Sequence, residues 1–118
     1  MGINVVIVDD DAGFRRLATT LPAWRGCTVV AAVPDGKSGI EAVQCLTPDA
    51  VLLDVNLPDR DGLAVAQDLR GHHHPIAVIL TSTEIGPWTD QELADAGVRA
   101  FIPKEALLDA DLSALFSS

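Results

Sequence analysis

Five short apolar runs, rich in β-branched residues, recur along the chain and limit its fold more than any other feature. Their first residues lie 25, 22, 26 and 22 positions apart. Because the runs are mostly continuous rather than alternating, they predict strands that are buried on both faces. The five runs are Ile3–Val8, Thr28–Val33, Ala50–Leu53, Ile76–Leu80 and Val98–Ile102.

The segments between these runs carry apolar residues at the spacing of a helix. Strands that alternate with helices predict βαβ units, and hence an α/β fold whose parallel sheet is covered by helices on both faces. Gly86-Pro87 should delay the fourth helix, so we expect it to begin near Pro87 or Trp88, with the proline in its first turn. The helical signals are Phe14, Leu17 and Leu21; Ile40, Val43 and Leu46; Leu63, Ala66 and Leu69; Asp90–Ala96; and the tail Leu107–Phe116.

Length and composition favour a single globular domain over residues 1–118, with a hydrophobic content of 48%. A formal net charge of −9 argues against direct binding of DNA or RNA, which requires a basic surface. It suits a cytoplasmic protein whose partners are proteins or metal ions. We expect neither a signal peptide nor a membrane span, and we expect Cys27 and Cys45 to remain thiols rather than form a disulfide.

Polar side chains gather where the apolar runs end. Asp9–Asp11 follow the first run, Asp54 ends the third, Thr81 and Ser82 end the fourth, and Lys104 follows the fifth. Open parallel sheets bind their ligands at the carboxyl ends of their strands. The sequence therefore predicts a site with several acids, a hydroxyl and one ammonium group at one edge of the sheet.

The acids in this predicted site require a cation or a proton, because carboxylates about 4 Å apart repel each other by roughly 4 kcal/mol at an effective dielectric constant near 20. Hard oxygen ligands with open positions suit Mg²⁺, which can also offset the charge of an incoming phosphoryl group. Asp54, alone at its strand end, is the natural nucleophile. A purely structural interpretation competes: Asp11 is expected to cap the first helix, Asp54 could begin a turn with Asn56 and Pro58, and Lys104 could start a surface helix.

Four motifs, "VVIVDDD", "LLDVNLPDRDG", "VILTS" and "AFIPK", occur in this order and together span most of the chain. In these motifs the sequence resembles the receiver domain of two-component response regulators. The resemblance implies a CheY-like, flavodoxin-like fold with strand order 2-1-3-4-5. In that order the first and third strands are neighbours, so Asp9 and Asp10 would lie against Asp54.

The resemblance also implies a role for each matching residue. Asp54 corresponds to the aspartate that accepts a phosphoryl group, and Asp9 and Asp10 to the acidic pair that holds Mg²⁺ together with Asp54. Asn56 corresponds to the position whose backbone carbonyl binds the metal, and Lys104 to the lysine that contacts the phosphate. Pro58 and Gly62 correspond to the turn that follows the acceptor.

Two positions of the implied switch are less sharply defined. Counting 22 residues back from Lys104 reaches Ser82, whereas the end of "VILT" favours Thr81; we prefer Ser82 as the switch hydroxyl. Phe101 corresponds to the aromatic residue that changes rotamer on activation, although it could equally be an ordinary buried strand residue. Pro103 precedes Lys104 here, whereas many receivers place the proline after the lysine.

The implied function is that of a phosphoacceptor in a signalling relay rather than an enzyme, with only weak self-dephosphorylation. A histidine kinase or phosphotransfer protein would donate the phosphoryl group. Phosphorylation would then change the surface of the fourth helix, fifth strand and fifth helix, which would bind a partner, an attached effector such as a DNA-binding domain, or a second copy in a homodimer. Trp88 could anchor such an interface or pack within the domain.

Other functions remain open at this point. A pseudo-receiver that binds partners without being phosphorylated is the main alternative. A phosphatase of the dehalogenase type requires D-x-D-x-[TV] after the first strand, and Asp9-Asp10-Asp11-Ala12-Gly13 lacks the last residue of that pattern. An FMN-binding flavodoxin requires a phosphate loop rich in Ser, Thr and Gly, which is missing here. The run His72–His74 is expected to be a solvated loop rather than a metal site, and Trp24 to pack at the end of the first helix.

Overall fold

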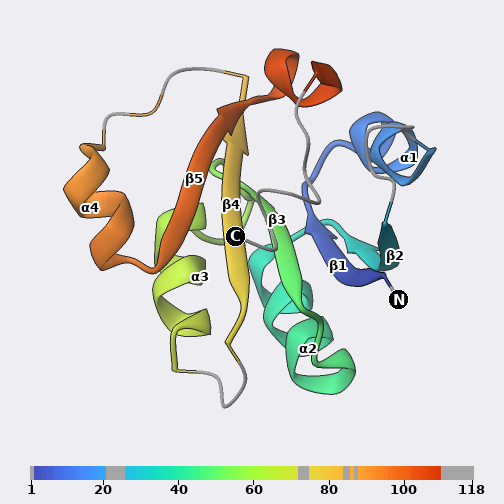
Figure 1. The fold of residues 1–118 in the computed structure, drawn as a ribbon, viewed down its shortest axis with the longest axis horizontal. Coiled ribbons are helices and arrows are strands. Elements are labelled where there is room, and N and C mark those ends of the chain that lie inside the picture. The colour runs from blue at the N-terminus through green and yellow to red at the C-terminus, as the bar shows by residue number, and fades with distance from the viewer. Residues whose placement is uncertain (1, 21–25, 72–74, 84–85, 87, 110–118) are drawn as a thin grey trace.

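The five strands form one parallel sheet in the order β2-β1-β3-β4-β5 (Figure 1), which confirms the predicted fold. The structure is a computed structural model, and it describes residues 2–20, 26–71, 75–83, 86 and 88–109. The strands are β1 (Ile3–Val8), β2 (Cys27–Val33), β3 (Ala50–Asp54), β4 (Ala77–Ser82) and β5 (Val98–Pro103). The helices are α1 (Ala12–Thr20), α2 (Gly36–Leu46), α3 (Gly62–Leu69) and α4 (Asp90–Asp95), and a 3-10 helix follows at Lys104–Asp109.

Three strands continue past their apolar runs to include residues that were expected at their carboxyl ends. β3 includes Asp54, β4 includes Thr81 and Ser82, and β5 includes Pro103. The cause is pairing between strands, since Asp54 is aligned with Thr81 and Ser82 with Pro103 across the sheet. Polar residues that end an apolar run in sequence therefore belong to the rigid sheet.

The start of the fourth helix differs from the prediction. α4 begins at Asp90, and the Thr89 side chain is its N-cap, accepting a hydrogen bond of 3.1 Å from the Glu92 backbone N–H. Asp90 and Glu92 in the first turn also suit the positive end of the helix dipole. The expectation of a start near Pro87 or Trp88 was wrong because this local cap sets the boundary; Pro87 itself lies outside the described residues.

Of the predicted tail helix Leu107–Phe116, the structure describes only the first three residues, and these belong to the 3-10 helix that begins at Lys104. Residues 110–118 lie outside the described part of the chain, as do Leu21, Trp24 and His72–His74. Cys27 and Cys45 form no disulfide, as expected. Within the described ranges, no helix is both long enough and apolar enough to cross a bilayer.

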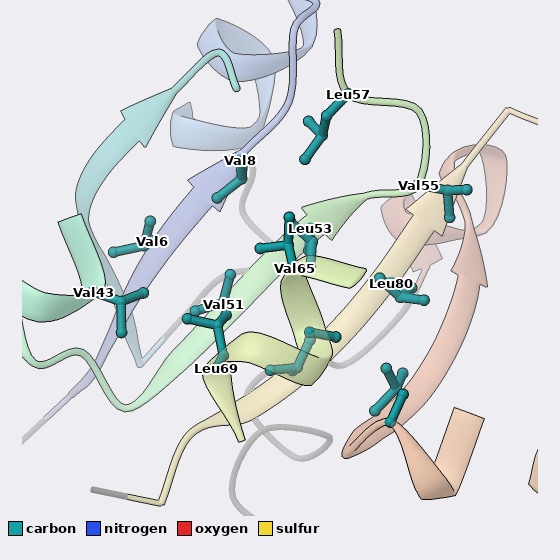
Figure 2. Close-up of a cluster of buried hydrophobic side chains, with 14 residues drawn as sticks. Val6, Val8, Val43, Val51, Leu53, Val55, Leu57, Val65, Leu69 and Leu80 are labelled. Carbon is teal, nitrogen blue, oxygen red and sulfur yellow. The ribbon is translucent and has the colours of Figure 1, made fainter. Parts of the chain in front are cut away.

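The sheet separates two layers of buried side chains, because successive strand residues point to opposite faces. One layer, the α2/α3-side cluster, joins strand residues such as Val6, Val51 and Leu80 to Val43 of α2 and Leu69 of α3 (Figure 2). The other, the α1-side cluster, consists of Val5, Ile7, Ala18, Ala50, Leu52, Ala77, Ile79 and Leu107. Each fully buried Val, Leu or Ile contributes about 1.5–3 kcal/mol, so these layers hold the strand ends firmly in place.

The turn after β3 depends on a glycine. The Gly62 N–H donates a hydrogen bond of 2.8 Å to the Val55 carbonyl, and Asn56 forms an antiparallel bridge with Asp61. A Cβ atom at Gly62 would lie only 2.4 Å from the Asp54 carbonyl oxygen. Residue 62 must therefore lack a side chain for the loop Val55–Asp61 to fold back against the end of β3.

We expect Gly62→Ala to lower the free energy of unfolding by about 3 kcal/mol, because the added methyl group overlaps rigid backbone. Urea denaturation followed by circular dichroism measures this loss. Gly71→Ala is the matched control, since the nearest atom to its Cβ is 3.7 Å away. Equal stabilities of the two variants would contradict the close approach at Gly62.

Candidate functional site

Asp9 lies immediately after β1 and is fully buried, with 0% of its surface exposed. Its N–H donates to the Val33 carbonyl at 3.0 Å, and its Oδ1 accepts a hydrogen bond of 2.9 Å from the Asp11 N–H. The Arg15 guanidinium donates to the Asp9 carbonyl at 2.7 Å. These contacts hold the Asp9 carboxylate in one orientation. Asp11 caps α1 as predicted, since its Oδ1 accepts from the N–H groups of Gly13 and Phe14.

Three carboxylates meet at the carboxyl ends of β1 and β3. One oxygen from each of Asp9, Asp10 and Asp54 lies within 4.8 Å of the other two. They meet because β1 and β3 are neighbours in the sheet, with Val8 aligned with Leu53. Asp9 and Asp54 are buried, whereas Asp10 is exposed, so one side of the cluster is open to solvent.

Lys104 supplies a positive charge to this cluster. Its Nζ lies 2.7 Å from Asp9 Oδ2 and 4.0 Å from Asp54 Oδ2. The same Nζ lies 4.5 Å from the centre of the Phe14 ring, a cation–π contact. The helical pattern marked Phe14 only as a core residue of α1, and its contact with the lysine was missed. Sequence offers no signal for it, because α1 and the end of β5 are brought together only by the fold.

The environment of Asp54 raises the pKa of its carboxyl group from 3.8 to about 6. The largest cause is burial, and the next is the negative charge of Asp9. The Lys104 ammonium and a backbone hydrogen bond from Asn56 act in the opposite direction, and the Asp10 charge adds to the rise. Negative charge therefore outweighs positive charge around Asp54, which is the condition under which a divalent cation with oxygen ligands binds favourably.

The two candidate hydroxyls occupy opposite faces of β4. Thr81 is aligned with Asp54 across the sheet, and both follow, two residues on, members of the α1-side cluster, Ile79 and Leu52. Thr81 and Asp54 therefore share a face, whereas Ser82 follows Leu80 of the α2/α3-side cluster. Both hydroxyl residues are buried, at 1% and 2% exposure. Thr81 Oγ1 has no hydrogen-bond partner among the described residues, which is unusual for a buried hydroxyl.

Phe101 lies on β5, aligned with Leu80 of β4, and is partly buried against the α2/α3-side cluster. The Trp88 ring packs on it, with the ring centres 6.3 Å apart and the planes inclined by 57°. Trp88 also packs against the core and lines, with Asn56 and Arg60, a hollow beside the loop that follows β3. Of the two interpretations of Trp88, packing within the domain is the one observed.

This arrangement defines a class of protein: a doubly wound α/β domain with an acidic cluster, a lysine and a hydroxyl at the carboxyl ends of its central strands. A family model described as the response regulator receiver domain matches residues 5–115. The chain belongs to this family.

Named relatives agree with this membership. The chain is 32% identical over 106 residues to a protein-glutamate methylesterase/protein-glutamine glutaminase of Alkalilimnicola ehrlichii, with 88% of the chain and 27% of that protein aligned. It is 26% identical over 113 residues to the DNA-binding transcriptional activator EvgA of Escherichia coli K12, with 96% of the chain and 55% of EvgA aligned. The chain thus spans about a quarter to half of the length of these relatives.

Among solved structures, the signal receiver domain of the response regulator NarL from Mycobacterium tuberculosis is similar, with a TM-score of 0.79 and 26% identity. The alignment covers 99% of this chain and 98% of that one. The resemblance of the sequence to receiver domains is therefore confirmed for the fold and the family.

The raised pKa of Asp54 predicts a specific dependence of stability on pH. Between about pH 4 and pH 6 the folded protein retains a proton that the unfolded chain releases, so in the absence of divalent cations its stability falls as the pH rises through this range. Asp54→Asn should remove this loss, which amounts to about 3 kcal/mol at about 1.4 kcal/mol per unit of pKa.

Urea denaturation with a chelator present, from pH 4 to pH 7.5, measures the difference between the wild type and Asp54→Asn. Asp68→Asn, which removes an exposed carboxylate paired with Arg60, is the control and should keep the wild-type dependence. Parallel profiles for the wild type and Asp54→Asn would contradict the raised pKa.

Proposed function

We propose that residues 1–118 form one receiver domain that accepts a phosphoryl group on Asp54, in the presence of Mg²⁺, from a histidine kinase or phosphotransfer protein. The observation that carries this proposal is the meeting of three carboxylates and the Lys104 ammonium at one edge of the sheet. A solvated acidic surface would not bury two of its acids beside a lysine, because burial without a ligand or partner is costly.

In this proposal Asp9, Asp10, Asp54 and the Asn56 carbonyl hold the Mg²⁺ ion. The ion supplies positive charge to the transferring phosphoryl group. An oxygen of Asp54 attacks phosphorus, so that a bond between this oxygen and phosphorus forms as the bond between phosphorus and the donor's imidazole nitrogen breaks. Lys104, already within 4.0 Å of Asp54, then pairs with an oxygen of the bound phosphoryl group.

Thr81 is the better candidate for the switch hydroxyl, although the residue count favoured Ser82. Thr81 shares a face with Asp54, and its buried Oγ1 lacks a partner among the described side chains and backbone groups. A count of residues back from Lys104 does not by itself give a position across the sheet, because β5 bulges. Arg99 is an extra residue between the partners of Val78 and Ile79, so that position along the chain and position across the sheet differ by one.

The proposed conformational change begins at this hydroxyl. On phosphorylation Thr81 would donate a hydrogen bond to the phosphoryl group and shift the end of β4, and Phe101, aligned with the residue before Thr81, would repack. Trp88 transmits this change because it packs on Phe101 and reaches the loop after β3. The altered surface over α4, β5 and the segment that follows would bind a partner, an attached effector or a second copy.

The relatives carry an esterase activity or a DNA-binding activity in proteins longer than this chain, so the effector is proposed to be separate from the receiver itself. The domain acts in the cytoplasm as a phosphoacceptor and not as an enzyme. Its net charge of −9 argues against direct contact with nucleic acid.

Incubation with acetyl phosphate and Mg²⁺ should add one phosphoryl group to the wild-type protein, seen by intact-mass spectrometry. Asp54→Asn should abolish labelling, because an amide lacks the nucleophilic carboxylate. Asp68→Asn should be labelled like the wild type, and a chelator should block labelling of both. Labelling that persists in Asp54→Asn would exclude Asp54 as the acceptor, and a wild type that binds no Mg²⁺ would favour the pseudo-receiver.

Two alanine variants separate the candidate hydroxyls. With beryllofluoride as a mimic of the phosphoryl group, Trp88 fluorescence in a Trp24→Phe background should change in the wild type as Phe101 repacks against it. Thr81→Ala should lose most of this change, and Ser82→Ala should keep it. The opposite result would return the role to Ser82.

A further inference from the structure

The residues proposed to hold Mg²⁺ lie on separate segments. Asp9 and Asp10 directly follow β1 and Asp54 ends β3, so the backbone of all three lies at the edge of the sheet. Asn56 belongs to the loop Val55–Asp61, which extends beyond the sheet edge. The position of the Asn56 carbonyl therefore depends on what anchors this loop.

The loop is anchored through Asp59. Asp59 Oδ1 accepts a hydrogen bond of 2.8 Å from the Gly36 N–H, and Oδ2 accepts one of 3.0 Å from the Lys37 N–H. Gly36 and Lys37 are the first two residues of α2, whose N–H groups have no partner within the helix. One carboxylate thus joins the loop after β3 to the start of α2 by two hydrogen bonds.

This contact is separate from the ordinary cap of the helix. Asp35 already caps α2, since its Oδ1 accepts a hydrogen bond of 2.7 Å from the Ser38 N–H. Asp59 is thus a second carboxylate at the same helix end, supplied from 23 residues away in the sequence. The two N–H groups hold the pKa of the Asp59 carboxyl group below its usual value of 3.8, so it is ionised at neutral pH.

The start of α2 is in turn tied to Asp9. The Asp9 N–H donates to the carbonyl of Val33, the last residue of β2, and Gly36 follows three residues later. A short series of contacts therefore runs from Asp9 through Val33 and Gly36 to Asp59, and along the loop to Asn56. Because every step is a hydrogen bond or a few covalently linked residues, this series restricts the distance between the acidic pair and the Asn56 carbonyl.

Close approach at Gly36 makes the contact specific. A Cβ atom at Gly36 would lie 3.2 Å from Asp59 Oδ1 and 3.0 Å from Val65 Cγ2. Both distances are tighter than usual for a Cβ atom, so with a side chain at residue 36 Asp59 and Val65 would have to move by a few tenths of an ångström. Gly36→Ala therefore disturbs the contact while leaving the charge of Asp59 in place.

We propose that Asp59 is a positioning residue for the metal site: by bridging the loop Val55–Asp61 to the start of α2, it sets the Asn56 carbonyl at a fixed place relative to Asp9, Asp10 and Asp54. This inference rests on the proposed function. It predicts that loss of Asp59 weakens Mg²⁺ binding although none of the proposed ligands is changed, as for other residues that orient metal ligands.

Isothermal titration calorimetry with Mg²⁺ tests the proposal on the wild type and on Asp59→Ala, Asp59→Asn, Gly36→Ala and Asp68→Asn. We expect both Asp59 variants to raise the Kd for Mg²⁺ about tenfold. Asp68→Asn, which also removes one negative charge, should raise it less than about twofold, because distant exposed charges are screened. Gly36→Ala, which keeps the charge, should also raise it, and this result separates geometry from electrostatic attraction.

Two further readouts exclude a general loss of structure. Without metal, exchange of the Gly36 and Lys37 amide protons should be faster in Asp59→Ala, while the sheet amides keep their protection. At saturating Mg²⁺, labelling of Asp54 by acetyl phosphate should recover toward the wild-type rate, because the defect lies in metal affinity.

The outcomes that overturn the inference are distinct from those that overturn the proposed function. A wild type that binds no Mg²⁺ would overturn both. A wild type that binds Mg²⁺, with Asp59 variants that bind it as Asp68→Asn does, would overturn the positioning role alone. Unchanged exchange of the Gly36 and Lys37 amides in Asp59→Ala would show that the contact does not anchor the loop and would overturn the positioning role as well.

Discussion

The rest of the site depends on the ion pair between Lys104 Nζ and Asp9 Oδ2, which lie 2.7 Å apart. Two carboxylates are buried at the edge of an apolar sheet, and a third lies within 4.8 Å of them. Such crowding is unfavourable in isolation, since each buried charge loses solvation and the acids repel one another. The lysine offsets part of this cost, and burial, followed by the charge of Asp9, still raises the pKa of Asp54 to about 6.

The fold makes this crowding tolerable by holding the strand ends rigidly. The α1-side and α2/α3-side clusters fill both faces of the sheet, and Asp54 is paired with Thr81 as part of a strand rather than as part of a loop. Gly62 then allows the chain to turn back directly over the Asp54 carbonyl. Carboxylates held this close together favour the binding of a cation, because its positive charge lowers their mutual repulsion. A further charged group at this edge would change the same balance.

Asp59 and Phe14 are not members of the carboxylate cluster, but their contacts support it from other parts of the fold. Phe14 covers the lysine ammonium from α1, and Asp59 ties the loop after β3 to α2. Both contacts join elements that are remote in the sequence, and both restrict parts of the chain around the carboxylate cluster. Trp88 has a comparable position on the other side, between Phe101 and the loop.

The resemblance to receiver domains implied the strand order 2-1-3-4-5. From the residue pattern alone, the alternation of strands and helices, the existence of an acidic edge and the candidates Asp9, Asp10, Asp54 and Lys104 could be predicted. These follow from local causes: continuous apolar runs predict buried strands, and polar residues directly after them must lie at one edge of a parallel sheet. The placement of Thr81 rather than Ser82 beside Asp54 and the bridge from Asp59 to α2 were decided only by the tertiary structure. The start of α4 at Asp90 was also missed, although its cap is local, since Thr89 accepts a hydrogen bond from Glu92 three residues on. The bulge in β5 and the hydrogen bond across 23 residues depend on contacts between distant segments, and no pattern along the chain encodes such distances.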